Sequence, residues 1–267
     1  GAAPVRVWDP EGPSGGAIAP PLWDALRDAV LWAQNEWERA IEIATELERL
    51  SGVPFRKEIA QYYCEMAMKS ILANDNRTAG QQLEMALDAN KNCMRANAML
   101  GEIEATAGAH EAAISIWKRI EFQQPQYLSL IAAKMLASYR VLGKTREGVN
   151  LLKTYLQTYQ LPVLLKVVYE ATMAEEGAEN AASLARNELA KKPSLQTLDQ
   201  LLEARALLDK NESQDTHLMQ QTVRNAIGNR YAYCCEQCGF RARNYHWQCP
   251  ACNSWESFPP EQKEANA

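Results

Sequence analysis

The sequence predicts an all-α chain of repeated helical hairpins, followed by a small module that binds a metal through four cysteines. Two observations carry this prediction. From Leu22 onward, Ala, Leu, Glu, Gln and Lys dominate, and apolar residues recur at spacings of three and four. That spacing is typical of amphipathic helices. Near the C-terminus, five of the seven cysteines fall within 19 residues.

The N-terminal stretch does not share the helical pattern. Residues 1–21 hold five Pro and four Gly and show neither a helical nor a strand period. We interpret them as an irregular leader, or as an arm added to the natural sequence. Residues 22–227 are then predicted as helical repeats. Residues 38–50 illustrate them, with Ile41, Ala44, Leu47 and Leu50 on one side of a helix and charged residues on the other.

The helices repeat with a period near 34 residues. Shifting the chain by 34 aligns residues of similar size, and a shift of 35 then places Ala113 on Gly148. The pairs at the shift of 34 are Ala67 with Gly101, Ala79 with Ala113, and Leu83 with Trp117. Small residues let two antiparallel helices approach closely, while large ones fill the adjacent holes. We therefore expect the small residues to lie at helix crossings and the hairpins to stack on one another.

The end of the helical region is also marked. Residues 177–193 are predicted to form the second helix of a further hairpin, and residues 195–227 a closing hairpin. Gly228 is a suitable helix stop, because glycine readily adopts the left-handed conformation that ends many helices.

The cysteine cluster indicates a metal site rather than disulfides. A secreted disulfide scaffold spreads an even number of cysteines along a short chain, whereas this number is odd and clustered, and the N-terminus lacks a secretory signal. Two Cys-x-x-Cys pairs, ten residues apart, supply four thiolates for one closed tetrahedral site that suits zinc or iron. The predicted ligands are Cys235, Cys238, Cys249 and Cys252.

Residues around the two pairs support this interpretation. Gly239 and Asn253 each follow a pair, and both residue types tolerate the positive φ that turns backbone N–H groups toward the sulfurs. Five aromatic residues are expected to form the small core of the module: Tyr233, Phe240, Tyr245, Trp247 and Trp255. Two alternatives stay open, in which Cys234 shifts the register of the first pair or His246 replaces one ligand.

Charge and motifs weigh against other classes of function. The net charge is −5, and residues 228–267 carry four basic and four acidic residues, which disfavours nucleic-acid binding. Outside the irregular residues 1–21, the sequence has no glycine-rich phosphate loop, Gly-x-Ser-x-Gly turn or His-Glu-x-x-His helix. We therefore expect a protein that is not an enzyme.

The helical repeats resemble tetratricopeptide repeats, and the cysteine motif is similar to a rubredoxin-type module. Tyr-x-Cys-x-x-Cys-Gly-Phe followed by Trp-x-Cys-Pro-x-Cys-x-x-Trp resembles the C-terminal module of the lipopolysaccharide assembly protein B family. The stretch NEWERAIEIATEL and the helices after it resemble the later repeats of that family. The resemblance spans residues 35–259 and implies a tetratricopeptide-like solenoid with a rubredoxin-like metal module docked against it.

The resemblance also implies a function. Family members act on the cytoplasmic side of the bacterial inner membrane as adaptors. They promote degradation of the committed-step deacetylase of lipid A synthesis by a membrane AAA+ metalloprotease, alongside other lipopolysaccharide-assembly proteins. They begin with a membrane-spanning helix and earlier repeats that this sequence lacks. We therefore interpret the chain as a cytoplasmic fragment with an added leader, or as a divergent short relative, with membrane contact only in the intact protein.

Repeat phase suggests where partners bind. The first helix of each hairpin lines the groove of such stacks, so the expected partner-binding residues are Gln61, Arg95, Glu102 and Arg140. The metal module is expected over residues 228–258, with a disordered tail at 259–267. Two other functions remain as alternatives, a rubredoxin-like electron-transfer protein and a zinc-ribbon nucleic-acid-binding protein. Self-association as a homodimer is left open.

Overall fold

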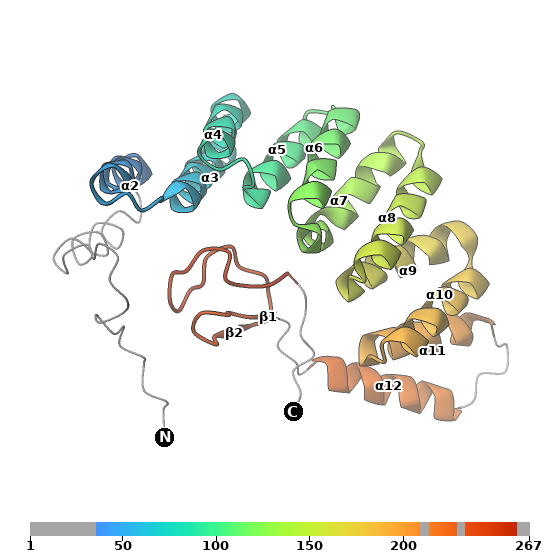
Figure 1. Cartoon of the computed structure of the whole chain (residues 1–267). Helices are drawn as coiled ribbons and strands as arrows, with labels where there is room; N and C mark the ends of the chain where they lie inside the picture. Colours follow the sequence, from blue (N-terminus) through green and yellow to red (C-terminus); the bar gives the residue numbers. More distant parts are fainter. Residues whose placement is uncertain (1–35, 209–213, 229–232, 261–267) are drawn as a thin grey trace, which may run out of the picture. The chain divides into compact units, whose positions relative to one another are not determined.

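The computed structural model describes residues 36–208, 214–228 and 233–260. The predicted leader (residues 1–21) and most of the predicted tail, from residue 261 onward, lie outside these ranges. The chain divides into two compact units, Gly1–Lys91 and Asn92–Ala267. Helices make up most of the described part of both units, and Figure 1 shows them in chain order.

Three helices form the described part of the first unit: α2 (Trp37–Ser51), α3 (Arg56–Leu72) and α4 (Asn76–Ala89). Each helix packs on the next one. Helix α2 buries Ala44 and Leu47, as the sequence predicts. Leu50, on the same side of the helix, is 59% exposed in the last turn, next to the left-handed residue Gly52 that ends the helix.

The second unit continues the pattern with more hairpins and ends in a two-stranded ribbon. Its helices are α5 (Met94–Thr106), α6 (His110–Gln123), the 3-10 helix η1 (Pro125–Tyr127), α7 (Leu128–Val141), α8 (Thr145–Tyr159), α9 (Pro162–Glu176), α10 (Ala178–Lys191), α11 (Leu195–Leu208) and α12 (Gln214–Gly228). The strands β1 (Tyr233–Cys234) and β2 (Arg241–Ala242) pair antiparallel. One apolar core runs through α5 to α9.

The turns inside the hairpins show the repeat directly. Four of them contain a residue with positive φ, at Asn74, Gly108, Gly143 and Gly177, which are 34, 35 and 34 residues apart. The first three turns also close with equivalent backbone hydrogen bonds, such as Asp75 N–H to the Ser70 carbonyl at 2.9 Å. In these three turns the pattern is the left-handed helix ending that glycine and asparagine favour. The predicted period and the closing hairpin, α11 with α12, are therefore confirmed.

Small residues lie at the helix crossings, as predicted. Gly101 of α5 lies against the indole of Trp117 of α6, and a Cβ added there would come within 2.2 Å of the Trp117 Nε1 atom. The Trp117 side chain is 1% exposed and donates a hydrogen bond of 3.1 Å to the Ala98 carbonyl. Gly148 of α8 lies similarly close to Tyr139 of α7. The close crossing fixes how each hairpin packs.

None of the helices in the described ranges combines the length and the apolar character that crossing a lipid bilayer requires.

The Gly101 crossing generates a stability prediction with an internal control. Because the indole of Trp117 is held by its hydrogen bond, Gly101→Ala should overpack the crossing and lower the free energy of unfolding by about 1–3 kcal/mol. Gly80→Ala in α4 should instead raise it by about 1 kcal/mol, since its Cβ meets nothing within 4 Å and alanine favours helix. Urea unfolding followed by circular dichroism measures both. Two shifts in the same direction would contradict this account of the crossing.

Candidate metal centre

The two cysteine pairs form matching turns. In the first turn, Gly239 N–H donates to the Cys235 carbonyl at 2.9 Å, and in the second, Asn253 N–H donates to the Cys249 carbonyl at the same distance. Gly239 has φ 75° and Asn253 has φ 59°, so the predicted positive φ values are confirmed. Each turn therefore directs its two thiols to one side of the backbone.

The structure brings four sulfur atoms together. The Sγ atoms of Cys235 and Cys252 are 3.7 Å apart, and so are those of Cys238 and Cys249. All four lie within 4.8 Å of one another. A tetrahedral metal with metal–sulfur bonds of about 2.3 Å has sulfur–sulfur edges of about 3.8 Å. The arrangement therefore fits one metal ion with four thiolate ligands, and we propose these cysteines as the ligands. Zinc and iron both suit it.

Hydrogen bonds to the sulfurs favour their ionised form unequally. Burial alone would raise the pKa of the Cys235 thiol, but the Ser257 hydroxyl and the backbone N–H groups of Cys238 and Gln237 lower it to about 6. At Cys238 the N–H of Phe240 favours the thiolate, yet burial and the neighbouring cysteines raise the pKa to about 12. Thiolates this close repel one another, so a cation among them is needed before all four ionise.

Two serines next to the sulfurs were missed by the sequence analysis. The Oγ atom of Ser257 lies 3.3 Å from the Cys235 sulfur, and the Oγ atom of Ser254 lies 3.3 Å from the Cys252 sulfur. Hydroxyls at this distance orient metal ligands and tune their charge. The signal available in the sequence is their position, two and five residues after the last cysteine.

The two alternative ligands lie outside the sulfur cluster. Cys234 is on β1, where successive side chains point to opposite faces. Its sulfur lies 3.6 Å from the Gly239 carbonyl oxygen and does not belong to the group of four. The His246 ring packs at 5.8 Å from the ring of Phe258.

The core of the module differs from the predicted one. Its buried residues are Cys235, Cys249, Ala242 and Phe258, and Phe258 is fully buried. Tyr233 and Tyr245 pack against them, as expected, but Phe240 is 39% exposed, so its predicted place in the core is wrong. Phe258 was missed by the sequence analysis. It reaches the core because the chain returns past Cys235 after the second cysteine pair, and the spacing of residues does not show this return.

The remaining aromatics face the helical repeats. The Trp247 ring stacks on the ring of Tyr127 of η1, with centroids 5.6 Å apart and planes 7° from parallel. Tyr245 meets Trp247 edge to face at 5.1 Å, and both side chains pack against the apolar core of the helices. Since stacked and edge-to-face aromatic pairs add to the energy of apolar burial, these rings attach the module to the helices.

Arg95 of α5 adds a charged contact to this attachment. Its guanidinium carbon lies 5.6 Å from the centre of the Trp255 ring, within the range of a cation–π interaction. Arg95 was predicted from repeat phase to bind a partner protein. In the structure its side chain is only 5% exposed and contacts the metal module instead.

The other residues predicted to bind partners differ in their exposure. Gln61 of α3 belongs to the first unit and is 1% exposed, so a partner cannot reach it in this structure. Glu102 of α5 forms an ion pair with Lys134 of α7, and Arg140 is exposed near the end of α7. Only Glu102 and Arg140 of the four are thus accessible to another protein.

The sulfur geometry predicts that Cys249 is needed for metal binding and that Cys234 is not. Cys249→Ser should reduce the bound metal from one ion per chain to near none, because a three-sulfur site holds zinc or iron far less tightly. Cys234→Ser is the matched control and should keep full metal content. Elemental analysis of the purified variants measures both. Loss of metal in Cys234→Ser alone would contradict the assignment.

The aromatic attachment predicts a loss of stability at high pH. Burial and the nearby carboxylate of Glu256 raise the pKa of Tyr127 from 10.0 to about 12. Burial, with Tyr127 close by, also raises the pKa of Tyr245. Because the unfolded chain releases these protons near pH 10, the stability that they contribute is complete below pH 10 and falls as the pH rises toward 12.

The heat-unfolding midpoint of the wild type should therefore fall more steeply between pH 10 and 12 than that of Tyr127→Phe, which has no proton to release at this position. Parallel curves for the two proteins would contradict the role of Tyr127.

Comparison with known proteins agrees with this architecture. Residues 233–260 match the family model described as the rubredoxin metal binding domain. Lipopolysaccharide assembly protein B of Escherichia coli K12 is 26% identical over 234 residues, which cover 85% of this chain and 59% of that protein. The protein of the same name from Haemophilus influenzae is 24% identical, with 85% and 57% covered. The chain thus spans less than two thirds of the length of these relatives.

The chain also shows some similarity to solved structures. One contains TPR-like repeats from Podosopora anserina, with 15% identity, a TM-score of 0.42, and coverage of 64% of this chain and 96% of that one. Another is a thermophilic TPR protein of Thermus thermophilus, with 16% identity, a TM-score of 0.39, and coverage of 70% and 98%. The sequence resemblance to lipopolysaccharide assembly protein B is confirmed over 85% of the chain, with a rubredoxin metal binding domain at residues 233–260.

Proposed function

We propose that this protein is a non-enzymatic adaptor in lipopolysaccharide assembly. One observation carries the proposal: a stack of helical hairpins and a four-cysteine module packed on it occur together in a chain similar over 85% of its length to lipopolysaccharide assembly protein B. Stacked hairpins present extended surfaces that suit protein binding rather than chemistry. Four thiolates leave a metal no open position for a substrate, which supports a structural metal.

The adaptor acts on the cytoplasmic side of the inner membrane. It brings the committed-step deacetylase of lipid A synthesis to a membrane AAA+ metalloprotease and so limits lipopolysaccharide output. Holding two proteins close together raises their effective concentration, which accelerates proteolysis without any catalytic residue in the adaptor. The family resemblance supports this pathway, and the exposed side chains of Glu102 and Arg140 offer part of a surface for it.

The metal module contributes by holding the helical surface in shape. Trp247 and Tyr245 cover part of the apolar core of the helices, and Arg95 contacts Trp255. Loss of the metal would unfold the module and expose this core, because a module of this size has little apolar surface of its own to bury. Partner regulation therefore depends on the four cysteines even if no partner touches them.

One observation favours a second function, electron transfer. Cys238 is exposed, and a rubredoxin-type iron site exchanges electrons through such an accessible ligand. Iron in this site would colour the purified protein, and chemical reduction would bleach it reversibly. A colourless protein that holds one zinc ion would exclude electron transfer, and the adaptor function would be the one that remains.

The adaptor proposal predicts the turnover of the deacetylase in cells. When the intact protein is depleted, the deacetylase should persist several-fold longer after protein synthesis is stopped. Re-expressed protein with Cys249→Ser should fail to restore turnover, whereas Cys234→Ser should restore it. Immunoblots of the deacetylase against time measure both. An unchanged deacetylase half-life on depletion would overturn the proposal.

A further inference from the structure

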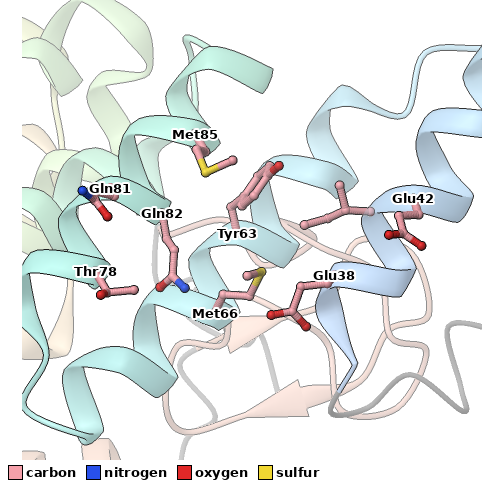
Figure 2. A pocket seen from close by; sticks show the side chains of 9 residues that line it. Glu38, Glu42, Tyr63, Met66, Thr78, Gln81, Gln82 and Met85 are labelled. Atoms are coloured by element: carbon pink, nitrogen blue, oxygen red, sulfur yellow. The ribbon is translucent and has the colours of Figure 1, made fainter.

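The first unit contains a groove whose lining includes none of the predicted partner-binding residues. It is lined by residues of α2, α3 and α4 and has a volume of about 370 Å³. Figure 2 shows side chains from all three helices around it. This volume lies within the range of protein pockets that bind ligands or side chains.

The floor of the groove is apolar and adaptable. Ile41, Tyr63, Met66 and Met85 line it, and Met85 is 48% exposed. Methionine is unbranched and flexible, so two of them can adjust to side chains of different shape. Burial of these residues by a partner removes apolar surface from water, which is the main source of affinity at such sites.

The α2 wall of the groove is acidic. Glu38 and Glu42 lie one helical turn apart and line it. Neighbouring Glu36, Glu46 and Glu48 each have an arginine within 3.7 Å. Across residues 36–208, 214–228 and 233–260, by contrast, no ion pair is found for Glu38 or Glu42. The groove thus presents two carboxylates that a cationic group can pair with.

The opposite wall offers hydrogen bonds. The Oε1 atom of Gln82 on α4 accepts a hydrogen bond of 2.8 Å from the Ser70 hydroxyl, which fixes the side-chain amide. Its NH2 group can donate to a backbone carbonyl of a bound chain. An apolar floor between a carboxylate wall and an amide wall matches a peptide more closely than it matches a purely apolar ligand.

We propose that this groove binds a protein segment that places a large apolar side chain on the methionines and an adjacent Lys or Arg beside Glu38 and Glu42. The acidic wall would repel phosphate headgroups of anionic lipids, so charge complementarity favours a basic peptide over a membrane surface. The proposal rests on the adaptor function and adds the chemistry of one partner. Tyr63 lies about 200° around α3 from Gln61, so the groove is on another face of α3 from this predicted partner-binding residue.

The test uses the full chain and a defined peptide. The probe is a synthetic amphipathic helix with leucines on one face flanked by lysines, and the comparison peptide carries Glu in place of each Lys. Methyl NMR of methionine-labelled protein reports the site, because Met66 and Met85 line the groove while Met68, 37% exposed on α3, does not. The Lys peptide should shift Met66 and Met85 but not Met68, and the Glu peptide should shift none of them.

Two variants of α2 give the matched control. Glu42→Lys should weaken binding of the Lys peptide about fivefold, the size expected for an exposed charge contact. Glu46→Lys, one turn away and paired with Arg49, should change it less than about twofold. Both residues are exposed, and circular dichroism should confirm that both variants keep their helical content.

Several results would overturn the proposal. The first two are equal affinity for the Lys and Glu peptides and NMR shifts confined to other methionines. The third is an equal loss of affinity in Glu42→Lys and Glu46→Lys. The fourth is a shift of Met66 and Met85 with anionic lipid vesicles but not with the Lys peptide. If the groove does not bind the peptide, the adaptor function can still stand and would use another surface, because deacetylase turnover tests it separately. Peptide binding combined with unchanged turnover would instead reject the adaptor function and keep the groove.

Discussion

The folding of the second unit depends on four sulfur atoms that lie within 4.8 Å of one another. The two cysteine turns begin 14 positions apart in the sequence, at Cys235 and Cys249, and hydrogen bonds such as Glu236 N–H to the Ser257 carbonyl at 2.8 Å join their segments. Beyond the cysteines, the apolar cluster of the module consists of Ala242 and Phe258, with Tyr233 and Tyr245 partly buried against it. A domain of this size cannot offset its conformational entropy by apolar burial, so metal binding supplies the missing folding free energy.

The aromatic contacts extend this constraint to the helices. Trp247 meets Tyr127 only when the second cysteine turn is formed, because Trp247 is two residues before Cys249. Tyr127 in turn belongs to η1, which connects the α5–α6 hairpin to α7. Metal binding is therefore coupled to the packing of one particular repeat rather than to a separate tail. Within the stack itself, the closely packed crossings at Gly101 and Gly148 fix how the two helices of their own hairpins pack together.

Features fixed by neighbouring residues could be predicted from the sequence. The positive φ of Gly239 and Asn253, the repeat period and the small residues at the crossings each follow from spacing alone. Features that depend on distant segments could not be predicted. Repeat phase places Arg95 on a face of α5, but it cannot reveal that Trp255, far along the chain, covers that face. For the same reason Phe258 was missed and Phe240 was wrongly placed in the core.

Hydrogen exchange with and without the metal tests most directly whether the sulfur site supports the helices. Chelation of the metal should remove protection from the amides of residues 233–260 and should also weaken protection in α5, η1 and the start of α7, where Tyr127 and Arg95 lie. The amides of α11, away from these contacts, should change little. If the loss of protection stops at the module and the helices exchange as before, the metal does not support the repeat stack, and the account is wrong.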